Sequence, residues 1–209
     1  MLRKLIVSIL ITLTLRSLSP LGHRWLPMVE ARDPACFFNP LCSCSKPHPD
    51  LGLVECLDVQ LPVVPVSLNS STVYILVLRS NGLRDIEPHS FHRTGLTRLE
   101  ITNNELTGLG PYSLIGLERT LRELDLTANH LTSVPRAPLA RLTRLRELNL
   151  NHNQIGDLRG ELDFPVSLRN SLKVLRMASN SLVSLDPLAF KNLASLEYVS
   201  RETVPDQKK

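Results

Sequence analysis

Hydrophobic and polar positions recur along the middle of the chain in a fixed order of eleven residues. The order is an apolar residue, two variable residues, Leu, one variable residue, an aliphatic residue or Met, two variable residues, Asn, one variable residue, and Leu or Ile. Five copies occur, at Val73–Leu83, Leu96–Leu106, Leu121–Leu131, Leu145–Ile155 and Leu172–Leu182. Their first residues are 23, 25, 24 and 27 positions apart, which predicts one strand and one returning loop per copy.

This order is the signature of a leucine-rich repeat, so we predict an α/β repeat solenoid. In the first copy, Val73, Leu76 and Leu78 are expected to face inward, and Asn81 to bond backbone groups that the turn leaves unpaired. One copy alone cannot bury its apolar side. We therefore expect the copies to stack as an arc with a parallel β-sheet on its concave face and irregular loops on its convex face.

The second half of each copy is less regular but carries apolar residues that we expect to complete the core. They are Ile86, Phe91, Leu109, Leu114, Val134, Leu139, Leu185 and Phe190. The fourth copy differs, because Asp163 stands where the others have an apolar residue, and Phe164 is predicted to fill that core position through a local bulge. A sixth copy begins at Leu196 but has Arg201 where an inward Leu belongs.

The first residues predict the route of the protein. Arg3 and Lys4 precede an apolar run from Leu5 to Leu15, which is typical of a secretory signal peptide and too short to span a bilayer as a helix. We expect cleavage between Ser17 and Ala31, with an uncleaved signal anchor as the alternative. The predicted organisation is a signal segment at 1–31, a cysteine-rich cap at 32–66, five full repeats and one partial repeat at 67–199, and a polar tail at 200–209.

Charge and composition change this picture little. The chain has 209 residues, of which 43% are hydrophobic and 4% aromatic, as an aliphatic repeat core requires. Its 24 basic and 20 acidic residues give a pI of about 9.0, but loss of residues 1–31 leaves 20 basic against 19 acidic. We therefore expect no nucleic-acid partner.

All four cysteines precede the first repeat, with the spacing C-x5-C-x-C-x11-C. An even number of cysteines beside a signal peptide favours two disulfides, although the spacing alone allows three pairings and a zinc site is the competing interpretation. The block, followed by Val54-Glu55-Cys56 and by Leu61-Pro62-Val63-Val64-Pro65, resembles the amino-terminal cap of extracellular leucine-rich repeat proteins. The resemblance implies pairs Cys36–Cys44 and Cys42–Cys56, and a cap that covers the open edge of the first coil. Two further segments, Gly116–Leu121 and Cys36–Pro40, are similar to the chaoptin-like arthropod surface adhesion proteins.

Candidate binding residues occupy the variable positions of the strands, which face outward between inward leucines. The third and fifth positions begin with Ile75 and Val77 and continue with charged residues, acidic in the middle copies and flanked by arginines. The candidates for partner contact are Arg79, Arg98, Glu100, Glu123, Asp125, Glu147, Asn149, Asn151 and Arg176. The alternative is that these side chains only pair with one another across the sheet, for example Arg98 with Glu123.

The expected function is an extracellular protein-binding module in cell adhesion or receptor-type recognition, with a protein ligand or cell-surface receptor, or a second copy of the chain, as partner. Asn69 begins an N-x-S/T sequence and is the expected glycosylation site. No catalytic motif, metal-ligand spacing or phosphate loop occurs, so no enzyme activity, cofactor or metal is expected. A structural matrix component resembling the small leucine-rich proteoglycans, and a truncated fragment of a longer receptor, remain as alternatives.

Overall fold

The computed structural model describes Cys36 and residues 39–46, 50–64, 72–158, 160, 163–186 and 188–200. The chain divides into Met1–Arg32 and Asp33–Lys209, and all described residues belong to the second unit. The predicted signal segment, the expected glycosylation site Asn69 and the tail from Arg201 onward lie outside the described residues.

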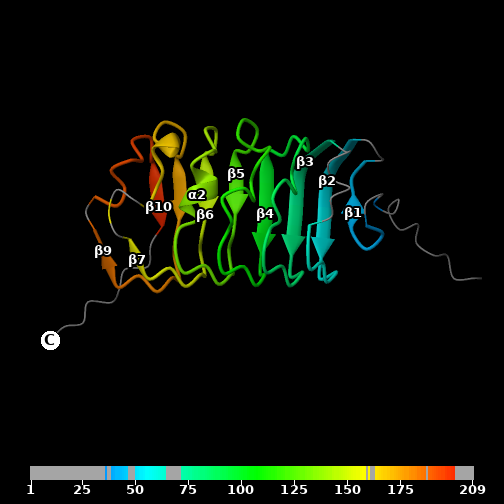
Figure 1. Ribbon diagram of the computed structural model, residues 1–209, viewed down its shortest axis with the longest axis horizontal. Helices are drawn as coiled ribbons and strands as arrows, with labels where there is room; N and C mark the ends of the chain where they lie inside the picture. Colours follow the sequence, from blue (N-terminus) through cyan, green and yellow to red (C-terminus); the bar gives the residue numbers. More distant parts are fainter. Residues whose placement is uncertain are drawn as a thin grey trace, which may run out of the picture. The chain divides into compact units, whose positions relative to one another are not determined.

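Eight strands of the described residues form one sheet, in which successive coils lie side by side (Figure 1). β1 pairs antiparallel with β2, and every later pair is parallel. This confirms the predicted solenoid. The strands are β1 (Ser43–Cys44), β2 (Asp50–Leu57), β3 (Thr72–Arg79), β4 (Arg98–Thr102), β5 (Glu123–Asp125), β6 (Glu147–Asn149), β8 (Val174–Arg176) and β10 (Tyr198–Ser200).

The register stacks the inward leucines of successive coils. Leu76 lies opposite Leu99, which lies opposite Leu124, and the row continues through Leu148 to Leu175. All five are at most 1% exposed. Burial of one such side chain contributes roughly 1.5–3 kcal/mol, so these repeated positions form a continuous core that no single coil has.

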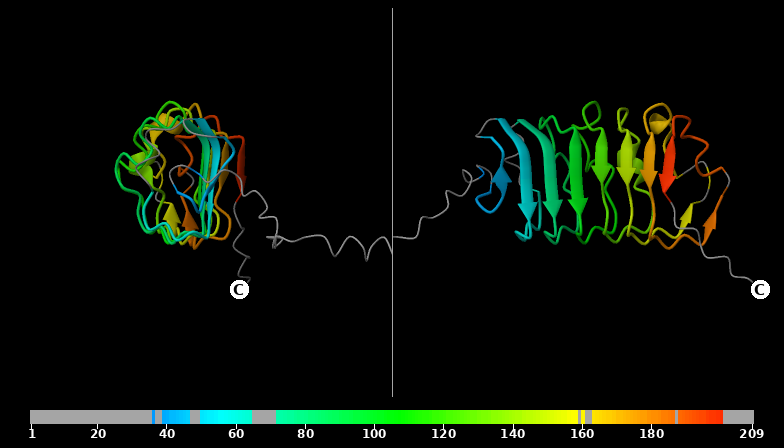
Figure 2. Two further views of the ribbon diagram at one scale, coloured as in Figure 1. Left: turned by 90° about the vertical axis from the view of Figure 1, so that its right-hand side faces the viewer. Right: turned by 180° about the vertical axis from the view of Figure 1, so that it is seen from behind.

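The returning loops cover the opposite side of the core, away from the main sheet (Figure 2). They include the short helix α2 (Arg136–Leu139), the 3-10 turn η2 (Val166–Leu168), and a two-stranded parallel sheet of β7 (Asp157–Leu158) and β9 (Ser184–Leu185). In the irregular fourth coil, Phe164 is fully buried, with its ring centroid 5.9 Å from that of Phe190. The prediction that Phe164, and not Asp163, fills the core position of this coil is therefore confirmed.

The asparagines of the five repeats form a continuous ladder of hydrogen bonds. The Asn129 side chain, which is 3% exposed, donates to Ile101 O at 2.7 Å and accepts from Leu106 N at 3.2 Å. Asn81, Asn104, Asn153 and Asn180 each bond the preceding coil in the same way. These amides satisfy the backbone groups that the sharp turn removes from the sheet.

The residue before each ladder asparagine has a left-handed backbone. The five positions are Ser80, Asn103, Ala128, His152 and Ser179, with φ between 53° and 56°. An L-residue in this region costs roughly 1–2 kcal/mol, so the ladder holds the turn in a conformation that the local sequence alone does not favour.

The amino-terminal cap contains disulfides between Cys36 and Cys44 and between Cys42 and Cys56, the pairs that the family resemblance implies. β2 has its own partner on each side, β1 and β3, so the first repeat does not end the sheet. The cap is also tied to the ladder, because the Asn81 side chain donates to Cys56 O at 2.9 Å. No helix in the described part of the chain is long and apolar enough to cross a membrane.

Candidate functional site

The solvent-facing side of the main sheet, here called the sheet face, carries most of the predicted binding residues. The register places Arg98, Glu123 and Glu147 next to one another on β4, β5 and β6. A second row, one pleat further along the strands, contains Glu100, Asp125, Asn149 and Arg176. These seven side chains therefore form one surface.

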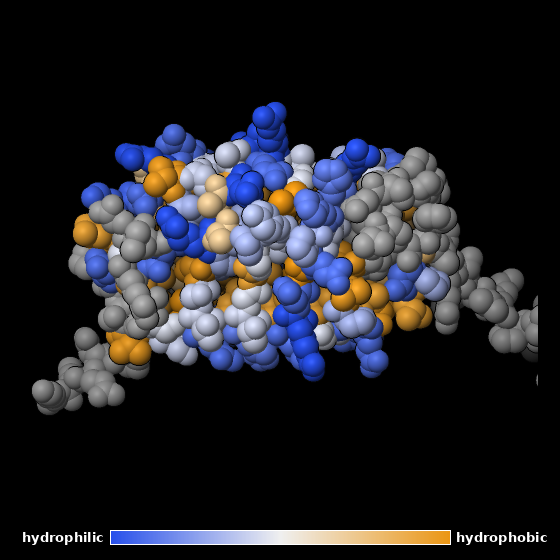
Figure 3. All heavy atoms as spheres, in the orientation of Figure 1, coloured by the Kyte–Doolittle hydropathy of each residue, from blue (hydrophilic) through white to orange (hydrophobic). Residues whose placement is uncertain are grey.

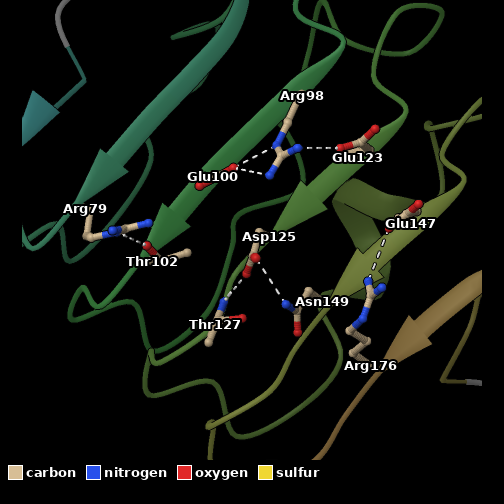
Figure 4. A network of polar contacts seen from close by, with 10 residues as sticks. All are labelled: Arg79, Arg98, Glu100, Thr102, Glu123, Asp125, Thr127, Glu147, Asn149 and Arg176. Carbon is tan, nitrogen blue, oxygen red and sulfur yellow. Dashed lines mark hydrogen bonds and ion pairs between the residues drawn. The ribbon is translucent and has the colours of Figure 1, made fainter. Parts of the chain in front are cut away.

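Arg98 links the two rows. Its guanidinium lies 2.6 Å from a Glu100 carboxylate oxygen on its own strand and 3.2 Å from a Glu123 carboxylate oxygen on the next strand (Figure 4). Burial lowers the pKa of Arg98, but the hydrogen bond to Glu100 and the charges of Glu100, Glu123 and Asp125 outweigh that effect and raise it. The cross-strand pairing of Arg98 with Glu123, which the sequence offered as the alternative to partner contact, is therefore present.

The other half of the sheet face is connected in the same way. Arg176 lies 3.2 Å from a Glu147 carboxylate oxygen across the β6–β8 pair. The Asn149 amide donates to one Asp125 carboxylate oxygen at 3.0 Å, while Thr127 N donates to the other at 2.8 Å. These contacts run across the neighbouring strands β4, β5, β6 and β8 (Figure 4).

Between these side chains lies a hollow of about 290 Å³. Its floor is Leu124, and its walls are Arg98, Glu123, Asp125, Glu147, Asn149 and Arg176. The lining contains two guanidinium groups and three carboxylates, and Glu100 adds a fourth carboxylate beside Arg98. These six side chains therefore have a net charge of −2. Such a surface favours a partner with a basic side chain at this point.

The charges on the sheet face remain accessible to solvent. The side chains of Glu123 and Glu147 are 44% and 43% exposed, whereas that of Glu100 is only 12% exposed. Exposed ion pairs of this kind contribute roughly 0–1 kcal/mol to stability. The network therefore orders the surface more than it stabilises the fold.

Three predicted residues lie apart from the hollow or have another role. Arg79 is exposed on β3, where its Nε donates to Thr102 Oγ1 at 3.4 Å. The Asn151 side chain accepts from Ala178 N at 2.7 Å, so it connects two coils at the turn. Val77 lies in register with Glu55 and Glu100 of the neighbouring strands, on the side of the sheet that we expected. It is only 6% exposed, because it lies between these longer side chains.

Thr102 and Thr127 occupy the seventh position of their repeats, like the candidates Arg79 and Asn151, and the sequence already placed them on this face. They were not selected as binding candidates, and their contacts were not predicted. Thr102 Oγ1 accepts from Arg79 Nε, and Thr127 N donates to Asp125. A threonine at the same position of two successive repeats was the signal available in the sequence.

A second hollow, of about 630 Å³, lies along the turns that follow the strands. Its lining is polar and includes Asn103, Glu105, His130, His152 and Gln154. Among the described residues, no three His, Cys, Asp or Glu side chains come together in a group that could hold a metal ion. The sheet face is the better candidate for recognition because it has a defined charge pattern.

The chain belongs to the leucine-rich repeat family. A family model described as "Leucine rich repeat" matches residues 71–120 and 119–170, and a second model of the same description matches residues 171–193. These matches cover the coils that build the sheet face. Membership of this family defines the fold but does not identify a ligand.

Three relatives show the range of similar proteins. The chain is 42% identical to Chaoptin of Drosophila melanogaster over 125 residues, which are 60% of this chain and 10% of the relative. It is 36% identical to Podocan-like protein 1 of Mus musculus, over 52% of this chain and 19% of the relative. It is 35% identical to Transforming growth factor beta activator LRRC32 of Mus musculus, over 53% of this chain and 16% of the relative. The chain thus spans between a tenth and a fifth of the length of these proteins.

Proposed function

We propose that this chain is an extracellular protein-binding module, used in adhesion or receptor-type recognition, whose sheet face contacts the partner. The observation that carries the proposal is the ordered charge network of Arg98, Glu123, Glu147 and Arg176 around the hollow. Its side chains are exposed, yet their positions are fixed by contacts across strands.

Order in the free protein favours binding. Fixing a flexible side chain at an interface costs about 0.5–1.5 kcal/mol, and a side chain that is already held by its neighbours avoids part of that cost. The alternative function of the same network, mutual satisfaction of charges on a solvated sheet, requires no excess of either sign. The excess of carboxylates over guanidinium groups supports the binding function, because it leaves charge for a partner.

Two features support the extracellular location in this proposal. Disulfides form and persist in oxidising compartments, and all four cysteines of the chain are paired. The similarity to Chaoptin agrees with the resemblance of Gly116–Leu121 to surface adhesion proteins. The signal segment at 1–31 and glycosylation at Asn69 are parts of the same proposal, and mass spectrometry of the secreted product tests both.

Charge reversal on the sheet face tests the site. The double variant Glu123→Lys, Glu147→Lys should lower the association rate for a protein partner about tenfold at low salt, since complementary charge acts mainly on encounter. The partner is first sought among purified extracellular domains, including a second copy of this chain, and association is followed by surface plasmon resonance.

The matched control is on the returning loops. Glu87 and His89 are exposed there, so Glu87→Lys repeats the charge change away from the sheet face, and His89→Ala removes a ring at the same loop. Neither should change the association rate. Equal losses for the sheet-face and loop variants, with folding intact, would assign the sheet face to mutual charge pairing alone.

A structural role in the extracellular matrix is the second candidate, supported by the similarity to Podocan-like protein 1. A matrix component would remain with the insoluble fraction after secretion, whereas a recognition module would be recovered from the medium or from cell surfaces. Fractionation of cells that express the tagged chain separates the two.

A further inference from the structure

A row of basic side chains lies at the rim where the chain enters the strands, and the proposed protein-binding surface does not use it. Arg122, Arg146 and Lys173 each immediately precede a strand residue of the sheet face. Arg146 N donates to Arg122 O at 2.7 Å, and Lys173 N donates to Arg146 O at 2.8 Å. These hydrogen bonds fix the three residues in consecutive coils, at the strand spacing of about 4.8 Å.

Three further arginines, Arg119, Arg144 and Arg169, lie in the loops that lead into the same strands. All six residues, here called the entry rim, are exposed. In the orientation of Figure 1 the strands β3 and β4 run downward, so the chain enters them along the top edge. Figure 3 shows the loop-covered side in the same orientation, with strongly hydrophilic groups along part of that top edge.

The arginines of the entry rim form no ion pair with any residue in the described ranges, and only Lys173 does, with Glu197 at 2.6 Å. The acidic residues next to rim arginines in the sequence already have partners. Glu123 and Glu147 pair with arginines of the sheet face, and Glu118 accepts a hydrogen bond from Gly116 N at 2.9 Å. The rim thus keeps its positive charge.

We propose that the entry rim binds a linear sulfated polysaccharide of the extracellular matrix. Arginine presents several N–H donors in a planar fork, which suits the oxygens of a sulfate group. A row of such groups at regular spacing matches a linear chain with charge at regular intervals, and clustered basic residues are the electrostatic footprint of polyanion binding.

The features of the rim favour a sulfated polysaccharide over other polyanions. The exposed aromatic residues Tyr74 and Tyr198 lie beyond the two ends of the row formed by Arg122, Arg146 and Lys173, and not between its basic side chains. Single-stranded nucleic acids require aromatic side chains along the row, on which their bases stack. The two disulfides place the chain in an oxidising compartment, where sulfated polysaccharides occur. The inference shares this compartment with the proposed function but uses a different surface.

Binding of the full chain to immobilised heparin at about 0.15 M salt tests the inference. The triple variant Arg122→Ala, Arg146→Ala, Lys173→Ala should bind between about 10-fold and 100-fold more weakly, since one basic residue near an anionic surface contributes about fivefold and Lys173 shares its charge with Glu197. The matched control Lys46→Ala, Arg84→Ala, Arg136→Ala removes three exposed charges elsewhere and should bind as the wild type.

Heparin without sulfate groups, single-stranded DNA and phosphatidylserine vesicles serve as comparison ligands. The inference predicts that each binds more weakly than heparin. It is overturned if the wild type does not bind heparin, if the triple variant and its control lose affinity equally, or if DNA, vesicles or desulfated heparin bind as tightly. Circular dichroism and two intact disulfides establish that the triple variant is folded.

The outcome is separable from that of the proposed function. Protein-partner binding is tested with Glu123→Lys and Glu147→Lys, whereas heparin binding is tested with residues that contact neither carboxylate in an ion pair. Loss of heparin affinity with normal partner association supports the rim alone. Normal heparin affinity in the triple variant overturns the rim and leaves the sheet face untouched.

Discussion

Each coil carries two kinds of polar side chain, and they differ in burial. The ladder asparagines lie inside the turns, with Asn129 only 3% exposed and bonded to backbone groups of two coils. The charged residues of the sheet face lie outside, with Glu123 and Glu147 more than 40% exposed. The buried row holds the solenoid together, whereas the exposed row is the one that we propose for recognition. Burial, rather than polarity, therefore separates the structural positions of this repeat from the positions proposed for binding.

The comparison predicts the largest loss of stability at the ladder. Asn129→Ala removes the partners of Leu106 N and Ile101 O, and each buried group left unpaired costs about 1–3 kcal/mol. We expect the free energy of unfolding in urea to fall by roughly 2–4 kcal/mol. A control variant, Gln154→Ala, removes an exposed amide one residue after a ladder position and should change it little. A loss below about 0.5 kcal/mol for Asn129→Ala, within the range of surface substitutions, would contradict the structural role of the ladder.

A smaller loss is expected at the left-handed residue before the ladder asparagine. Ala128 has φ 55°, and a β-branched side chain is strongly disfavoured in that region. Ala128→Val should therefore lower the free energy of unfolding by about 1–2 kcal/mol. Thr127→Val introduces the same side chain one residue earlier and should be neutral or stabilising, because it removes a buried hydroxyl that has no hydrogen-bond partner. A larger loss of stability for Thr127→Val than for Ala128→Val would show that the turn does not require a left-handed backbone at Ala128.

The ion pairs of the sheet face should contribute least to folding. A double-mutant cycle of Glu147→Gln and Arg176→Gln should give a coupling free energy of about 0.2–1 kcal/mol, which decreases as salt is added. Chemical denaturation of the four proteins measures it. A coupling near 3 kcal/mol would place this pair with the structural ladder and weaken its assignment to recognition.

The entry rim should have no measurable effect on stability. Arg122→Ala and Arg146→Ala are expected to change the free energy of unfolding by less than about 0.5 kcal/mol each, since both side chains are exposed and lack ion pairs with described residues. Thermal unfolding is sufficient for this comparison. A clear loss would indicate that the rim packs on the solenoid.

Much of the fold follows directly from the repeat. The inward leucines, the ladder asparagines and the substitution of Phe164 for Asp163 were all predictable, because each depends on a position inside the repeat and on the stacking of identical coils. The left-handed backbone at Ser80 and Ala128 could not be predicted, because serine and alanine rarely adopt this conformation. The asparagine ladder imposes it.

The candidate site was predictable as a set of positions but not as a set of contacts. Reading the third and fifth positions found Arg98, Glu123 and Glu147, because strand alternation decides which side chains face outward. The bond between Arg98 and Glu100 within one strand, and the burial of Val77, depend on side-chain length and on neighbours in other coils. The entry rim was missed because three of its residues occupy the second position of the repeats and the other three lie in the loops before the first position, and we had compared neither across coils.

Hydroxyl-radical footprinting of the complex reports most directly whether a partner covers the sheet face. The method compares the oxidation of side chains in the free and the bound chain. Four residues lie in the same register row as Arg98, Glu123 and Glu147, on either side of them. We expect a bound partner to protect these residues, which are Leu53, Ile75, Val174 and Tyr198. Unchanged oxidation of these four residues, with protection of exposed loop residues such as Tyr112 and Val166, would contradict recognition through the sheet face.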